Sequence, residues 1–135
     1  MAQLTVKADI SQLDRVLSFA DTILEEAGCK AKEQMQIDIA IEELFVNIAN
    51  YAYPEGEGDA LIEVEADSSA RSVKIVFEDS GIPYNPLENE DPDISLSAED
   101  RPIGGLGIFM VKKSMDEVSY EYKDGKNRLT VRKDF

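Results

Sequence analysis

The sequence has few of the features that mark secreted, metal-binding or membrane proteins. Its one cysteine in 135 residues, Cys29, can close no internal disulfide and matches no metal-ligand spacing, so we interpret it as a small residue at a helix end. No apolar stretch approaches the roughly 18 residues that span a bilayer. Residues 1–9 also lack the charged and apolar regions of a signal peptide. We therefore expect a cytoplasmic protein with no membrane partner.

Basic residues are scarce as well. The chain has 14 lysines and arginines against 28 acidic residues, which gives a formal net charge of −14. A charge of this size repels nucleic acid and anionic membranes at long range, so we expect no direct binding of nucleic acid. Long proline, serine or glycine tracts are absent, and a chain of this length is too short for two ordinary cores. We expect residues 1–135 to form a single domain.

The spacing of apolar residues alternates along the chain between the periods of strands and of helices. It predicts strands over residues 4–8, 62–66, 73–77, 118–122 and 129–131, and helices over 11–27, 32–52 and 107–115. This order is typical of an α+β fold. We expect a two-layer α/β sandwich, in which about three helices cover one face of a mixed, mostly antiparallel sheet.

Turn and cap residues support these boundaries. Asp9 or Ser11 can cap the start of the first helix, and Gly28 follows its end, where a left-handed backbone is common. Asp124-Gly125 between the last two apolar runs is a strong signal for a two-residue β-hairpin.

Polar residues on the second predicted helix form the first candidate site, within EELFVNIANYAYP. Glu43 and Asn47 are four residues apart, so they share one stripe of the helix, and Asn50 extends that stripe by a turn. Neither Glu43 nor Asn47 falls on the apolar stripe that predicts the buried face. On periodicity alone, these residues form either part of an active site or an ordinary solvated face.

A second candidate follows the third predicted strand, at Asp79-Ser80-Gly81. A carboxylate at a strand end can accept a hydrogen bond from an amino group such as that of adenine. Gly81 permits a close approach that other residues resist. The same tripeptide also occurs in ordinary turns, and both interpretations stay open at this level.

A third candidate is Gly104-Gly105-Leu106-Gly107, directly before the last predicted helix. Glycines expose backbone N–H groups and a helix start carries partial positive charge, so the segment can cradle phosphate. It is neither a Walker A loop nor a dinucleotide fingerprint, because the residues and context of those motifs are missing. The alternative is a flexible loop.

The three segments together resemble a known family. EELFVNIANYAYP, VKIVFEDSGIPYNP and RPIGGLGIFMVKKSMDEVSYEY stand in the order of the conserved boxes of the GHKL ATPases, which include histidine kinases, gyrase, heat-shock chaperones and MutL. The chain most resembles the stand-alone anti-sigma-factor serine/threonine kinases of bacteria, over residues 4–131. The resemblance implies the Bergerat ATP-binding fold, with ATP and Mg²⁺ as cofactors.

The resemblance also implies roles for individual residues. Asn47 would coordinate Mg²⁺ between the phosphates, and Glu43 would act as general base. Asp79 would accept the adenine amino group, with Gly81 packing against the base. The remaining residues that we expect at the nucleotide are Asn50, Arg101, Gly104, Gly105, Leu106 and Gly107.

The chain departs from the family pattern in two places. Pro83 stands where many relatives have a second glycine. The second departure is in the segment that follows.

The periodic spacing of apolar residues is lost for about 25 residues after Glu78, and we expect a mobile ATP lid at about residues 85–104. This lid is rich in acids that would repel a triphosphate, so either it stays open, or metal and the basic residues Arg101, Lys112 and Lys113 offset the charge. Arg101 is a candidate phosphate contact or a plain solvated arginine.

The function implied by the resemblance is that of an anti-sigma-type serine/threonine protein kinase. It would use Mg-ATP to phosphorylate a small anti-anti-sigma partner of the STAS type, and it would also bind a sigma factor, as a possible homodimer. The chain has no histidine, so it cannot be a sensor kinase that phosphorylates its own histidine. Two alternatives remain: a nucleotide-gated binding module with little or no kinase activity, and a structural α+β domain that binds no nucleotide.

Overall fold

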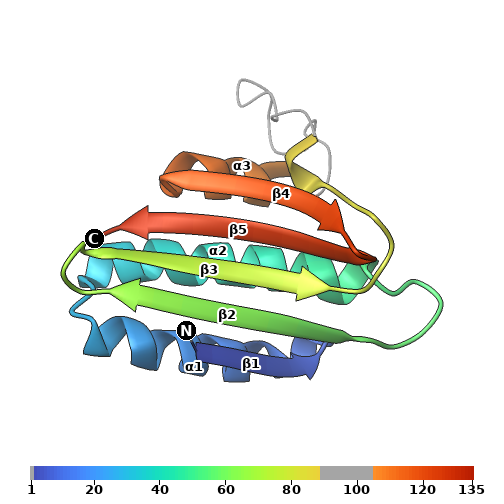
Figure 1. Ribbon diagram of the computed structural model, residues 1–135, viewed down its shortest axis with the longest axis horizontal. Coiled ribbons are helices and arrows are strands. Elements are labelled where there is room, and N and C mark those ends of the chain that lie inside the picture. Colours follow the sequence, from blue (N-terminus) through green and yellow to red (C-terminus); the bar gives the residue numbers. More distant parts are fainter. Residues whose placement is uncertain (1, 89–104) are drawn as a thin grey trace.

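Five antiparallel strands form one layer of the computed structural model (Figure 1), which describes residues 2–88 and 105–135. In spatial order they are β1 (Ala2–Lys7), β2 (Asp59–Asp67), β3 (Ser72–Asp79), β5 (Lys126–Asp134) and β4 (Glu117–Lys123). All four neighbouring pairs are antiparallel, so the prediction of a mixed sheet is wrong. β3 and β4 do run in the same direction, but β5 lies between them and separates them.

Helices make up the second layer. The three α-helices lie on one face of the sheet (Figure 1), which confirms the predicted two-layer α+β arrangement. They are α1 (Leu13–Glu26), α2 (Ala31–Tyr51) and α3 (Gly105–Ser114), with short 3₁₀ turns η1 (Ile10–Gln12) and η2 (Pro86–Glu88). No helix in the described ranges is long and apolar enough to cross a membrane.

The predicted cap and turn residues adopt the expected geometry. The Asp9 side chain accepts a hydrogen bond from the Ser11 N–H at 2.9 Å before the first helical turn. Gly28 has a φ of +82°, which ends α1 in the left-handed conformation. Asp124 and Gly125 both have positive φ, at 55° and 77°, as a type I′ hairpin turn between β4 and β5 requires.

The core lies between the layers and is built from alternate residues of the central strands. Val73, Ile75 and Phe77 of β3 are at most 2% exposed. Asp79 is the next residue with the same alternation, so the strand delivers its carboxylate to the helix side of the sheet. The neighbouring strand places Asn127 directly opposite Asp79. The sheet register therefore brings two polar side chains together at one end of an apolar core.

Candidate functional site

Asp79 is held at the end of β3 by two hydrogen bonds to the same carboxylate oxygen. Oδ1 accepts from the Gly81 N–H at 2.9 Å and from the Asn127 side-chain amide at 3.0 Å. The residue is only 6% exposed. Since a buried carboxylate is costly unless it is hydrogen-bonded, these donors make the buried position tolerable. Both of these hydrogen bonds go to Oδ1, and no described residue donates to Oδ2.

Asn127 connects Asp79 to the loop that follows β3. Its amide nitrogen also donates to the Ile82 carbonyl at 2.8 Å, and its carbonyl oxygen accepts from the Tyr84 N–H at 3.1 Å and from the Tyr120 hydroxyl. Burial raises the pKa of Tyr120, so this hydroxyl remains protonated and can donate at neutral pH. The sequence patterns do not single out Asn127. Its signal is an amide on the inner face of β5, where an apolar residue is expected.

The loop after β3 is also fastened to the end of α2. The Ile82 N–H donates to the Ala52 carbonyl at 2.9 Å, and the Ser80 N–H donates to the Tyr53 hydroxyl at 2.9 Å. Gly81 lies so close to this helix end that a β-carbon would sit 2.2 Å from the Ala52 carbonyl oxygen. Only glycine fits here without a shift of the backbone. The close packing therefore fixes the distance between α2, which carries Asn47, and the Asp79 carboxylate.

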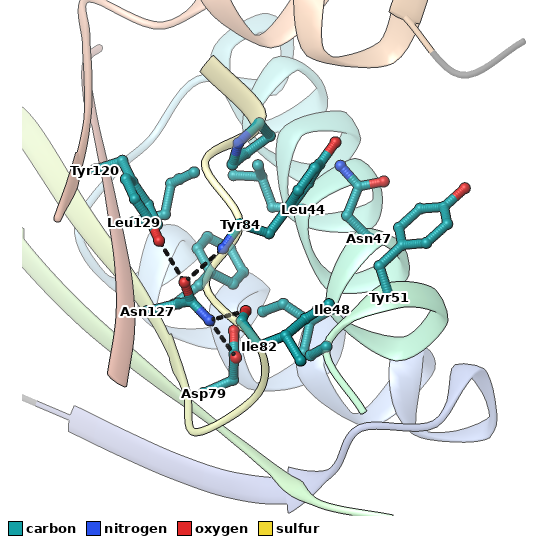
Figure 2. Close-up of a pocket in the computed structure, with 13 residues that line it drawn as sticks. Leu44, Asn47, Ile48, Tyr51, Asp79, Ile82, Tyr84, Tyr120, Asn127 and Leu129 are labelled. Carbon is teal, nitrogen blue, oxygen red and sulfur yellow. Dashed lines mark hydrogen bonds between the residues drawn. The ribbon is translucent and has the colours of Figure 1, made fainter. Parts of the chain in front are cut away.

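Asn47 and Asp79 line the same pocket (Figure 2). Asp79 and Asn127 are its buried polar groups, whereas Asn47 is half-buried on α2. The other lining residues are all apolar or aromatic: Leu44, Ile48, Tyr51, Ala52, Phe77, Ile82, Tyr84, Pro86, Tyr120 and Leu129. An apolar cleft with a few convergent polar groups is typical of small-molecule sites.

The pocket is narrow and has an exposed rim. Its volume of about 50 Å³ holds a few water molecules. Ile82 and Tyr84 form part of this rim and are 50% and 40% exposed, and the Tyr84 ring lies 6.3 Å from that of Tyr51 on α2.

Glu43 packs against the start of α3. A β-carbon on Gly107 would lie 2.0 Å from the Glu43 Oε2 atom, so the absence of a side chain at Gly107 makes room for the carboxylate. Glu43 is one turn before Asn47 on α2. The structure thus brings the predicted base and one glycine of the third candidate segment into contact. Their roles toward a ligand remain predictions.

Other predicted site residues lie apart from this pocket or outside the described residues. Asn50 is exposed and lines a separate cleft with Lys7, Asp9 and Tyr53, one turn beyond Asn47 along the same helix. Gly105 is the first residue of α3. Arg101, Gly104 and the side chain of Leu106 lie outside the described residues, as does most of the predicted lid.

The two lysines expected to offset the acidic lid lie at the far end of α3. Lys112 and Lys113 are in its last turn, and the Lys113 ammonium lies 5.5 Å from the centre of the Phe109 ring. Gly107 precedes them by five and six residues, which is a rise of about 7.5 to 9 Å along the helix axis. The start of α3 adds partial positive charge from its free backbone N–H groups.

Comparison with known proteins agrees with the fold. The model of the histidine kinase-like ATPase domain matches residues 6–133. The serine-protein kinase RsbW of Listeria monocytogenes is 30% identical over 128 residues, which cover 91% of this chain and 79% of that protein. The serine/threonine-protein kinase BtrW of Bordetella bronchiseptica is 28% identical over 101 residues, which cover 75% of this chain and 70% of that protein.

A solved structure has the same fold. The crystal structure of the RsbU and RsbW domains of Rv1364c from Mycobacterium tuberculosis superposes with a TM-score of 0.62 at 16% identity. The match covers 99% of this chain and spans about a third, 32%, of that one. Together with the family match over nearly the whole length, these similarities show that the chain belongs to the histidine kinase-like ATPase domain family.

Proposed function

We propose that the protein is an anti-sigma-type serine/threonine kinase that binds Mg-ATP and phosphorylates a small anti-anti-sigma partner. The observation that carries the proposal is that Glu43 and Asn47 lie one turn apart in the second half of α2, with Asp79 beside Asn47 in the pocket. Asn47 and Asp79 line one pocket, and the Glu43 carboxylate lies against the first turn of α3. The two relatives described above are named serine-protein kinase and serine/threonine-protein kinase, and their names support the same activity for this chain.

In this proposal the adenine ring enters the apolar pocket and its amino group donates to Asp79. The phosphates then extend along α2 toward the start of α3, where backbone N–H groups and the helix dipole favour negative charge. We place Gly104, Gly105 and Gly107 at the phosphates on this basis. The segment at about 85–104 would close over the nucleotide as a lid, and Arg101 would contact phosphate from it.

The residues present fit a magnesium ion that is shared with phosphates. Residues 2–88 and 105–135 contain no cluster of three His, Cys, Asp or Glu side chains that could hold a metal by itself. Mg²⁺ usually keeps several waters and takes only one or two protein ligands beside substrate phosphates, so the Asn47 side-chain oxygen suffices. When bound, the ion would neutralise charge on the phosphates.

Glu43 would accept the proton of the attacking serine or threonine hydroxyl. A general base needs to reach that proton, and it contributes about 10²–10⁴-fold to the rate. The contact with Gly107 holds the Glu43 carboxylate at the helix start to which the phosphates would bind. Positioning and charge neutralisation by the other groups would supply the rest of the acceleration.

The proposed context is cytoplasmic regulation of transcription. The partner would be a STAS-type protein, a sigma factor would be a second partner, and the kinase would act as a homodimer. The sigma-factor and homodimer parts rest on the family resemblance.

A phosphorylation assay with ATP, Mg²⁺ and a purified STAS-type partner tests the catalytic claim. We expect phosphoserine or phosphothreonine on the partner. We expect Glu43→Gln to lower kcat by about 10²-fold or more while ATP affinity stays within a few-fold. Glu42→Gln is the matched control, because Glu42 is the exposed neighbour on the same helix.

Asp79→Asn separates binding from chemistry. Loss of ATP affinity in this variant is expected, since its amide can present a donor where the adenine amino group needs an acceptor. ATP binding without any phosphoryl transfer by the wild-type protein would instead favour a nucleotide-gated binding module. Failure of the wild-type protein to bind ATP would contradict the whole proposal.

A further inference from the structure

The Asn127 side chain is an amide whose hydrogen-bonding capacity is fully used (Figure 2). An amide has two N–H donors and two acceptor positions on its oxygen. The donors go to Asp79 Oδ1 and the Ile82 carbonyl, and the oxygen accepts from the Tyr84 N–H and the Tyr120 hydroxyl. The opposite orientation of the amide would place its oxygen against two acceptors, so the orientation is determined by its neighbours.

Packing alone does not explain an amide at this position. Asn127 is 6% exposed and follows the same alternation as Leu129 and Val131, which are buried in the core. An apolar side chain would satisfy that environment, and a buried amide is costly without partners. The amide is therefore best explained by what it holds, which is the Asp79 carboxylate on one side and the loop of Ile82 and Tyr84 on the other.

We infer that Asn127 is a positioning residue that sets the base preference of the pocket. By donating to Asp79 Oδ1, it keeps the carboxylate as an acceptor and leaves Oδ2 for the amino group of a purine. The inference rests on the proposed function, since it takes the pocket to be the nucleotide site. It adds a residue from β5 to the site. The predicted members lie on α2, at the end of β3, on α3 and in the loops that follow β3 and precede α3.

The chemistry that follows is discrimination between an amino group and a carbonyl. Adenine presents an N–H donor at the position where hypoxanthine presents a carbonyl oxygen. A carboxylate acceptor binds the first and repels the second. Hydrogen bonds to charged groups contribute about 1.5–3 kcal/mol, which corresponds to a preference for ATP over ITP of roughly 10- to 100-fold.

Titration of the full chain with Mg-ATP and Mg-ITP measures this preference. Asn127→Asp replaces the donor by a second carboxylate beside Asp79. Two carboxylates at hydrogen-bond distance do not both ionise, so one proton is shared and Asp79 is no longer a pure acceptor. We expect the ratio of ATP to ITP affinity to fall about tenfold or more.

Tyr120→Phe removes only one support of the Asn127 amide, and we expect the affinity ratio to fall a few-fold. Tyr122→Phe is the matched control, since Tyr122 lies two residues along β4, is 47% exposed and does not line the pocket. Thermal unfolding of each variant identifies those that fold. A purely structural role would lower both affinities together and leave their ratio unchanged.

The outcomes separate this inference from the proposed function. A folded Asn127→Asp protein with the wild-type affinity ratio would overturn the inference and leave the kinase proposal intact. If Asn127→Asp does not fold, the affinity ratio is measured in Asn127→Ser. The serine hydroxyl has one hydrogen to donate, so it can bond to Asp79 or to the Ile82 carbonyl but not to both. An unchanged ratio there would also overturn the inference. A wild-type protein that binds neither nucleotide would overturn both.

Discussion

Two acidic side chains on neighbouring helices make stability depend on pH near neutrality. The carboxyl groups of Asp38 on α2 and Asp21 on α1 are neighbours. Within the described residues, Asp21 Oδ1 and Asp38 Oδ1 are buried without a hydrogen-bond partner. Burial and the neighbouring carboxyl groups of Asp21 and Glu25 raise the pKa of Asp38 from 3.8 to about 7. The folded protein therefore holds a proton that the unfolded chain has lost.

The sign and size of the effect follow from this pKa. Between pH 3.8 and about 7 the folded state binds more protons than the unfolded chain, so the free energy of unfolding falls as pH rises. If the carboxyl were fully desolvated, the total change would be about 4 kcal/mol. Asp38 is partly exposed, and solvent screening reduces the expected change to ~1–2 kcal/mol.

Asp38→Asn removes the ionisation and leaves an amide that can donate to Asp21. We expect this variant to be more stable than the wild-type protein by ~1–2 kcal/mol at pH 8. The gain should roughly halve at pH 5.5, about midway between the two pKa values of Asp38. Urea unfolding followed by circular dichroism at both pH values measures it, provided that the m-value is unchanged.

Glu42→Gln is the control for net charge, because it removes one negative charge from an exposed position on the same helix. We expect it to change stability by less than ~0.5 kcal/mol at either pH. An Asp38→Asn protein that is no more stable than wild type at pH 8 would refute the reasoning. A gain of the same size at pH 5.5 would refute it as well.

Two further predictions concern the site. Gly107→Ala should displace the flexible Glu43 carboxylate and lower kcat about 10-fold or more, with little change in urea unfolding. Gly56→Ala, where a β-carbon meets nothing within 4 Å, is its control, and wild-type kcat in Gly107→Ala would count against the proposed base. Tyr53→Phe should cost about 1 kcal/mol in urea unfolding, because the hydroxyl that accepts from Ser80 and donates to the Asp59 carbonyl is lost. Tyr51→Phe, which is 53% exposed, should cost almost nothing, and equal stability of the two variants would contradict this prediction.

The sequence predicted where helices and strands end, because the residues that mark these ends lie close together in the chain. Gly28 ends α1 through its own backbone conformation, and Asp124-Gly125 forms the hairpin turn for the same reason. Asp79 could be placed at a strand end by counting the alternation of β3. These features depend on residues within a few positions of each other, and they follow from the sequence without knowledge of which strands pair.

The remaining features depend on contacts between distant parts of the chain. Asn127 lies beside Asp79 only because β5 inserts between β3 and β4, and no local pattern reports that insertion. The same insertion explains why the sheet has no parallel pair. Asn50 continues the polar stripe of α2, yet it lines a different cleft, because residues 7–10 and 53–58 pack around that end of the helix. Strand order and the packing of distant segments around a helix are properties of the packed molecule.

The contact between Glu43 and Gly107 has an evolutionary consequence. The two residues are 64 positions apart, and the space that a β-carbon of one would need is filled by the carboxylate of the other. A lineage that gained alanine at position 107 would keep its acid in place only if helix α3 shifted, whereas a shorter side chain at position 43 would remove the constraint. We therefore expect substitutions at positions 43 and 107 to occur together among related sequences. Relatives without kinase activity should lack both the glycine and the glutamate.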